Sequence, residues 1–211
     1  MPDPATGYVE VATRSGFTVR LRQARHQDDR ALVVGFTHLS EESRYARFFT
    51  AVPRLAGSLL ESLTNVDGHS RIAIAAFDPA RESEVGEPDG YGIAVARWIQ
   101  ADDGSPTAEL AIAIIDEYQH LGLGHVLLTA LEVVAEARGI ERLEAVVLAS
   151  NLGMTRLLLR HGAHEVHATH PDPGIRVFAL DIRAPLLGPG DDALRDALRP
   201  LATASHGQPL P

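Results

Sequence analysis

The sequence contains no cysteine, and all 19 of its basic residues are arginine, so lysine is missing as well. Without cysteine the chain forms no disulfide, thiolate zinc site or iron–sulfur cluster, and it has no cysteine nucleophile. Without lysine it cannot form a Schiff base or build a P-loop around a lysine. These absences exclude several common classes of catalysis before any motif is considered.

Excess positive charge is also missing. The 28 acidic residues outnumber the bases and give a net charge of −9, which opposes the phosphate neutralisation that non-specific nucleic-acid binding requires. Residues 1–5 lack the basic and apolar stretches of a secretory signal, and no uncharged apolar run approaches the roughly 18 residues needed to cross a bilayer. We therefore expect a cytoplasmic protein with neither a nucleic-acid nor a membrane partner.

The apolar residues, 45% of the 211, are numerous enough to form a sizeable core. Their periodicity predicts helices near 31–39, 40–49, 55–63, 123–138 and 151–161, and strands near 17–22, 71–77, 91–99, 108–115, 143–148, 165–168 and 175–182. Pro and Gly become frequent after Arg183, with one short helical patch at 192–198. We expect one domain over 17–183, an N-terminal extension over 1–16 and a C-terminal tail over 184–211.

One segment is typical of a site that binds an anion. The strand 108–115 runs through Asp116-Glu117-Tyr118 into Gln119-His120-Leu121-Gly122-Leu123-Gly124, where a helix begins. Such a turn presents backbone N–H groups beside a positive helix end, which suits a pyrophosphate. The dinucleotide fingerprint is excluded because its third glycine position holds Leu127. By itself the segment is equally compatible with a purely structural turn.

The wider pattern resembles the GNAT N-acetyltransferases. Gln119-x-x-Gly122-x-Gly124, after a strand that begins Ala108-Glu109, is similar to their motif A, and Asn151-Leu152-Gly153-Met154 with Leu157 and Gly162 is similar to their motif B. Leu39–Phe49, Val19-Arg20-Leu21-Arg22 and Asp28 also resemble the acetyltransferase domain of Pat-type bacterial protein lysine acetyltransferases. The resemblance covers about 17–183.

This resemblance implies the GNAT fold, an α/β (α+β) architecture. Its mixed, mostly antiparallel sheet of about six to seven strands is flanked by helices and contains a central splayed parallel pair. It also implies acetyl-CoA as cosubstrate, with the pyrophosphate on the N–H groups of Leu121 to His125, the pantetheine along the preceding strand and Asn151 on the cofactor arm. The implied cofactor-binding residues are Ala113, Ile114, Ile115, Gln119, His120, Leu121, Gly122, Leu123, Gly124, His125 and Asn151.

Glu109 matches the family's general base. A lysine ammonium has a pKa near 10.4 and is almost entirely protonated at neutral pH, so a carboxylate that removes its proton through a water speeds the reaction. We expect a partly apolar strand environment to raise the pKa of Glu109; the alternative is a solvated side chain on a strand face. Many superfamily members have a tyrosine as general acid where this chain has Leu158, which leaves the acid unidentified.

A run of histidines at every third position invites a metal site, namely His161, His164, His167 and His170. In a strand this spacing alternates between faces, so the four side chains cannot converge without a turn. No cysteine is available, and no carboxylate pattern resembles a known site. We therefore expect no metal.

The sequence thus predicts an acetyl-CoA-dependent N-acetyltransferase that transfers directly in a ternary complex, with exposed lysines of proteins as acceptors. Two alternatives stay open: an enzyme that acetylates a small-molecule amine, and a non-catalytic module that senses acyl-CoA. The missing lysine has two explanations as well. Either a GC-rich genome encodes arginine in its place, or a lysine-modifying enzyme avoids offering itself as a target.

Overall fold

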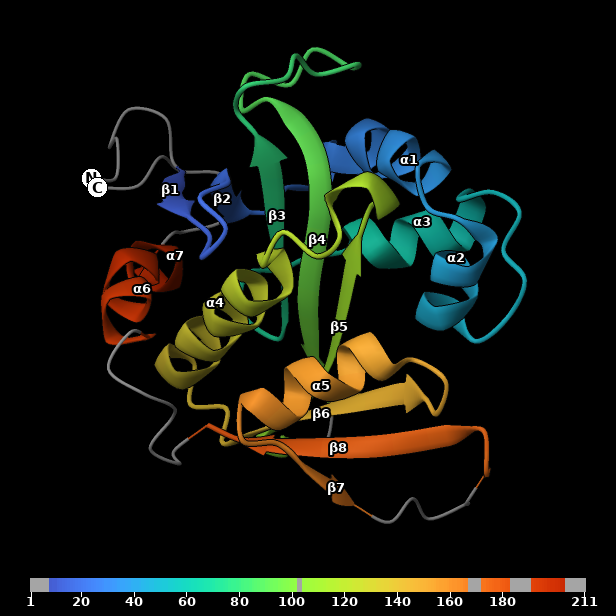
Figure 1. The fold of residues 1–211 in the computed structure, drawn as a ribbon, viewed down its shortest axis with the longest axis vertical. Helices are drawn as coiled ribbons and strands as arrows, with labels where there is room; N and C mark the ends of the chain where they lie inside the picture. Colours follow the sequence, from blue (N-terminus) through green and yellow to red (C-terminus); the bar gives the residue numbers. More distant parts are fainter. Residues whose placement is uncertain (1–7, 102–103, 167–171, 183–190, 204–211) are drawn as a thin grey trace.

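The computed structural model describes residues 8–101, 104–166, 172–182 and 191–203. They form one eight-stranded sheet in the order β1-β2-β3-β4-β5-β6-β8-β7 (Figure 1). The strands are β1 (Val9–Ala12), β2 (Thr18–Gln23), β3 (Arg71–Asp78), β4 (Tyr91–Gln100), β5 (Thr107–Ile114), β6 (Arg142–Leu148), β7 (His164–Val166) and β8 (Ile175–Asp181). All neighbours are antiparallel except β5 and β6, which are parallel.

Helices cover the sheet in two groups. One comprises α1 (Asp29–Thr37), α2 (Glu41–Phe48) and α3 (Gly57–Thr64), preceded by the 3-10 turn η1 (His26–Asp28). The other comprises α4 (Leu123–Ala137) and α5 (Leu152–Arg160), which lie in front of the sheet in Figure 1. The chain enters α4 through the 3-10 turn η2 (Asp116–Tyr118), and the last helices are α6 (Asp191–Leu198) and α7 (Pro200–Thr203).

Helix α4 is buried around most of its circumference. Its inner side packs on β3, β4 and β5, and its outer side is covered by α6 and α7. Leu198 and Leu201 from these last helices are fully buried in the same core. An apolar helix of this kind needs cover on both sides, because a single sheet contact would leave its outer leucines and valines in water.

A buried ion cluster connects β2 with the segments that precede α1 and β4. Arg22 on β2 is 1% exposed and makes two bonds to Asp28, at 2.7 and 2.9 Å, and one to Asp89 at 2.6 Å. Such a guanidinium fork paired with carboxylates holds its partners at fixed positions. The start of α1 and the loop before β4 are thereby attached to β2.

The predicted GNAT architecture is confirmed, including the splayed parallel pair. The sheet has eight strands rather than six to seven, since residues in the expected N-terminal extension form β1. The expected C-terminal tail contributes α6 and α7 to the packed core. Among the described residues, no helix combines the length and apolar character needed to span a bilayer.

Candidate active site

The sheet opens between β5 and β6. These strands pair at three positions, the last of which joins Glu109 to Glu144. Beyond this point β5 stays on β4 up to Ile114 and β6 stays on β8 up to Leu148. A V-shaped opening therefore begins directly after Glu109, and its β5 side is the stretch that ends in Ala113 and Ile114.

The side chains at the end of β5 alternate between two faces. Ile114 points toward α4, because its Cδ1 lies 3.9 Å from where a Cβ on Gly124 would be. Ala113 and Ile115 lie on the opposite face and line a cavity under the first three helices. Ile115 is buried, and its N–H donates to the carbonyl of Ile93.

The turn after β5 leads directly into α4. His120 and Gly122 adopt left-handed backbone conformations, with φ of 64° and 87°, and only glycine does so without steric cost. Helix α4 starts at Leu123 without a side-chain cap. Because the first N–H groups of a helix lack partners inside it, those of Leu123 and Gly124 are suited to bind an anion at the positive helix end.

Gln119 and Asp116 attach this turn to α2. The Gln119 amide donates to the Ile114 carbonyl and to the Ser43 hydroxyl, each at 3.2 Å. Asp116 accepts from the Ser43 hydroxyl at 2.7 Å and from the Ser40 backbone at 3.1 Å. Partial burial alone would raise the pKa of Asp116, but these hydrogen bonds from Ser40 and Ser43 outweigh it and hold the pKa below its usual value. The side chain of Gln119 therefore shapes the turn.

A second support comes from the turn between β1 and β2, which sequence reasoning missed. The Ser15 hydroxyl donates to the Leu121 carbonyl at 2.9 Å and lies 2.9 Å from the Thr13 hydroxyl. A Cβ on Gly122 would approach the Thr13 side chain to 3.4 Å. No local pattern signals this contact, because Ser15 and Leu121 are 106 positions apart.

The start of α5 borders the opposite side of the opening. Asn151 caps the helix, and its side-chain oxygen accepts from the Met154 N–H at 3.0 Å. The amide nitrogen of Asn151 then remains as the group that can donate to a cofactor. Helix α4 packs closely on α5 at Gly124, where a Cβ would lie 3.1 Å from the end of the Leu157 side chain and would require that side chain to shift.

Glu109 is exposed on β5, in contrast to the partly apolar environment that we expected. Its electrostatic neighbours are Arg47 on α2 and Arg97 on β4. Burial, together with the positive charges of Arg47 and Arg71, lowers the pKa of Arg97 to about 10. The negative charge of Glu109 raises this pKa but does not cancel the lowering. Sequence reasoning missed Arg97, although an arginine inside the apolar strand 91–99 was a visible signal.

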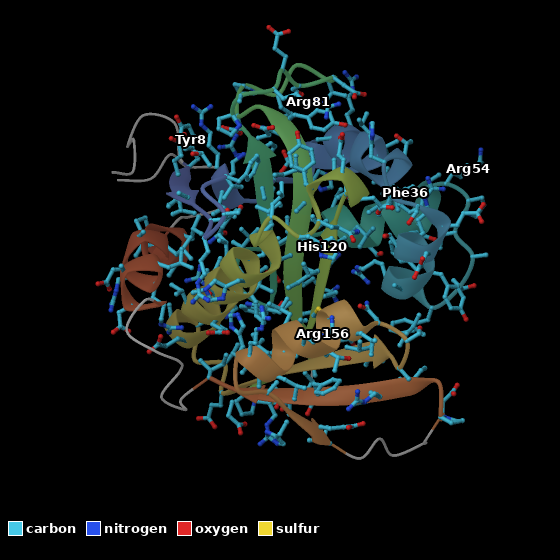
Figure 2. The ribbon with its side chains drawn as sticks, viewed as in Figure 1. Tyr8, Phe36, Arg54, Arg81, His120 and Arg156 are labelled. Carbon is cyan, nitrogen blue, oxygen red and sulfur yellow. The ribbon has the colours of Figure 1, made fainter. Side chains whose placement is uncertain are left out.

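The two predicted histidines of the turn differ in their surroundings. His120 is exposed on the turn that precedes α4, and Figure 2 labels it there, with Arg156 on α5. The His125 ring instead meets His161, with 2.9 Å between Nδ1 and Nε2. His161 Nδ1 lies 2.6 Å from Glu132, and both of these side chains are 2% exposed. The half-buried imidazole of His125 therefore contacts a buried pair, His161 and Glu132.

The position at which many members of the resembled family have a tyrosine as general acid holds a leucine in this chain. Leu158 is fully buried. Tyr118, the tyrosine of η2, donates its hydroxyl to Asp78 at 2.8 Å, and burial together with this hydrogen bond raises its pKa. Leu158 has no ionisable group, and the Tyr118 hydroxyl is already bonded to Asp78.

The histidine run does not gather around a common point in the part of the chain that the structure describes. His161 is held by Glu132, His164 is exposed on β7, and His167 and His170 lie outside the described residues. Within the described ranges, no three or more His, Cys, Asp or Glu side chains are placed to hold a metal ion.

The acetyltransferase (GNAT) family model matches residues 58–163 of this chain. That range contains Glu109, the glycine turn and the start of α5. The match therefore includes β5, β6, α4 and the start of α5, whereas α2 and the β1–β2 turn lie before it.

Individual relatives extend the similarity to nearly the whole chain. Acetyltransferase Pat of Mycolicibacterium smegmatis is 30% identical over 200 residues, which cover 93% of this chain and 56% of that protein. An acetyltransferase of Pseudomonas aeruginosa is 29% identical over 164 residues, which are 77% of this chain and 83% of that one. The crystal structure of the GNAT domain of S. lividans PAT superimposes with a TM-score of 0.73 at 28% identity, covering 85% of this chain and 99% of that domain. The chain spans only about half the length of the M. smegmatis protein.

Proposed function

Because the chain belongs to the GNAT family of acetyltransferases, we propose that it transfers the acetyl group of acetyl-CoA directly to lysine side chains of proteins. The observation that carries this proposal is the position of Glu109, the last residue of β5 that pairs with β6. A carboxylate there stands at the point where the sheet opens. The similarity to Pat domains supports protein lysine as the acceptor.

The cofactor would lie along the opening. Its pyrophosphate would meet the N–H groups of Leu121 to His125, where the helix dipole of α4 compensates part of the negative charge. This local field is required because the protein's net charge of −9 opposes the binding of a polyanion. The pantetheine would follow Ala113, Ile114 and Ile115, and the Asn151 amide would donate to the cofactor arm.

Glu109 would act as general base through a water. An ammonium with a pKa near 10.4 leaves about one lysine in a thousand reactive at neutral pH, and a positioned base typically contributes about 10²–10⁴-fold. The neutral amine would attack the thioester carbon, forming the amide bond as the bond to CoA sulfur breaks. The chain contains no cysteine, so no cysteinyl acetyl-enzyme can form, and the thiolate would leave without an assigned general acid.

The decisive experiment uses the two missing residue types. Without lysine the enzyme gives no signal of its own with an antibody against acetyl-lysine, and without cysteine it does not react with a thiol reagent that reports released CoA. We would add the protein and acetyl-CoA to a deacetylated bacterial lysate and blot for acetyl-lysine. We expect new bands with the wild type and about 10²–10⁴-fold slower labelling with Glu109→Gln.

Glu144→Gln is the matched control, since Glu144 is the partner of Glu109 on β6. It should retain labelling close to that of the wild type, and acetyl-CoA affinity should be unchanged in Glu109→Gln. CoA release from small amines without any labelled protein would instead indicate a metabolite acetyltransferase. Tight acetyl-CoA binding with no turnover on any amine would indicate a non-catalytic module that senses acyl-CoA.

A further inference from the structure

A cavity of about 100 Å³ lies between the sheet and the first three helices. Its walls are largely apolar and come from β3, β4, β5, α1, α2 and α3; Phe36, labelled on α1 in Figure 2, is one of them. Arg47 and Arg97 also line it. Two guanidinium groups in an apolar cavity call for an explanation, because buried charges are normally paired.

Arg97 is the more deeply placed of the two. It is 5% exposed, and its Nε has no hydrogen-bond partner within the described part of the chain. Its terminal nitrogens donate to the carbonyls of Leu63 and Ser62, at 3.4 and 3.3 Å. These long contacts at the C-terminal end of α3 are favourable for a cation, but they supply no negative charge and leave the Nε–H donor unused.

Arg47 faces the same space from α2. It is half-buried, and its guanidinium carbon lies 5.0 Å from the centre of the Phe48 ring. Burial lowers its pKa, and its charge contributes to the lowered pKa of Arg97. Among the described residues neither arginine forms an ion pair. The two like charges therefore repel each other, and the carboxylate among the described lining residues, that of Asp28, is bound to Arg22 at 2.7 and 2.9 Å.

The register of the sheet relates this cavity to Glu109. Arg97 pairs with Ala111 and Ile99 pairs with Glu109 across β4 and β5, so Arg97 and Glu109 lie on one face of the sheet, two positions apart. Both arginines are close enough to Glu109 for its charge to affect their pKa. One acidic group and two basic groups thus share one side of the opening.

We propose that this cavity binds a carboxylate carried by the amine acceptor, held by Arg97 and Arg47 while the amine lies at Glu109. The inference rests on the proposed function, because it takes Glu109 as the group that meets the amine. An acceptor with a cationic amine and a carboxylate mirrors the charges of the site, which favours it over a neutral analogue. The carboxylate has two possible sources: an acidic residue next to the acceptor lysine, or the carboxylate of a small amino acid.

The test compares two pairs of acceptors with acetyl-CoA and measures kcat/KM from released CoA. The first pair is a lysine peptide with a neighbouring glutamate and the same peptide with glutamine. The second pair is free lysine and lysinamide. We expect the wild type to prefer the acidic member of one pair by about tenfold or more in kcat/KM, since charge-assisted hydrogen bonds to a guanidinium are strong. The pair that shows this preference identifies whether the carboxylate belongs to a neighbouring acidic residue or to a small amino acid.

Arg97→Gln should lower kcat/KM for the preferred acceptor at least about tenfold more than for its neutral partner. If Arg97→Gln fails to fold, Arg47→Gln tests the same loss of preference for the acidic acceptor, because Arg47 is only half-buried. Arg142→Gln is the control, because Arg142 is a surface residue paired with Asp181 at 2.8 Å, and it should keep the wild-type preference.

Equal kcat/KM values within both pairs would overturn the inference, and acetylation of the neutral acceptors would show that the proposed function still stands. A preference that survives in both arginine variants would overturn it as well. A preference for succinyl-CoA over butyryl-CoA that disappears in Arg97→Gln would place the carboxylate on the donor, which also contradicts the inference.

Discussion

At the scale of single residues, the buried charges of this protein fall into two kinds. Glu132 and Arg22 have complete sets of partners, and their role is to hold helices and loops together. Arg97 has carbonyl contacts but no carboxylate among the described residues. A paired buried charge contributes to structure, whereas a buried charge without a counter-ion is more informative about a ligand.

The variant Glu132→Gln tests how much a paired buried charge contributes to stability. Glu132 meets His161 at 2.6 Å and Arg195 at 3.1 Å while 2% exposed. Removing its charge weakens both contacts, and we expect a loss of about 1.5–3 kcal/mol in the free energy of unfolding, measured with urea.

Glu136→Gln provides the comparison on the same helix. Glu136 also meets Arg195, at 2.7 Å, but its side chain is 63% exposed, so the loss should be at most about 1 kcal/mol. Equal losses in the two variants would show that burial does not strengthen the Glu132 contacts.

At the scale of elements, the glycine turn before α4 is held from two directions. The start of α2 binds it through Asp116 and Gln119, and the β1–β2 turn binds it through Ser15. A turn that presents N–H groups to an anion works best when its backbone is already in place, because the ordering cost is then not taken from the binding energy.

Ser15→Ala should therefore weaken acetyl-CoA binding although Ser15 lies outside the matched family range. The lost hydrogen bond to Leu121 is worth about 1 kcal/mol, which corresponds to about fivefold in Kd by calorimetry. Ser62→Ala removes a comparable exposed bond, from the hydroxyl to the Leu59 carbonyl at 2.8 Å, and should leave the Kd unchanged. Unaltered binding in Ser15→Ala would mean that the turn is adequately held by α2.

At the scale of the whole molecule, the segments on either side of 17–183 complete the domain. β1 forms one edge of the sheet, and α6 and α7 cover the outer side of α4, away from the cavity under α1 to α3. The Gln23 amide donates to the Leu201 carbonyl at 2.8 Å, which attaches α7 to β2. The last described helices are thus part of the core and do not cover the proposed acceptor side.

Leu198→Ala measures how much α6 contributes. Leu198 is fully buried, and its truncation should cost about 2–5 kcal/mol because a cavity remains beside α4. Leu159→Ala removes a leucine that is 52% exposed on α5 and should cost less than about 0.5 kcal/mol. A loss below 1 kcal/mol for Leu198→Ala would show that the domain is stable without α6, as the predicted boundary at 183 implies.

The sequence by itself determined what depends on neighbouring residues. Periodicity located most of the strands and helices. The glycine turn was visible because its backbone angles depend on its own residues, and the Asn151 cap because its hydrogen bond spans only three positions. The family resemblance then supplied the central splayed parallel pair and singled out Glu109.

Only the tertiary structure decided what depends on contacts between distant segments. The pairing of Glu109 with Glu144, the contact of Ser15 with Leu121 and the burial of Leu198 on α4 all join residues far apart in the chain. The same holds for the cavity that brings Arg47 to Arg97. Side-chain periodicity records which face of an element is apolar, but it does not record which other element meets that face.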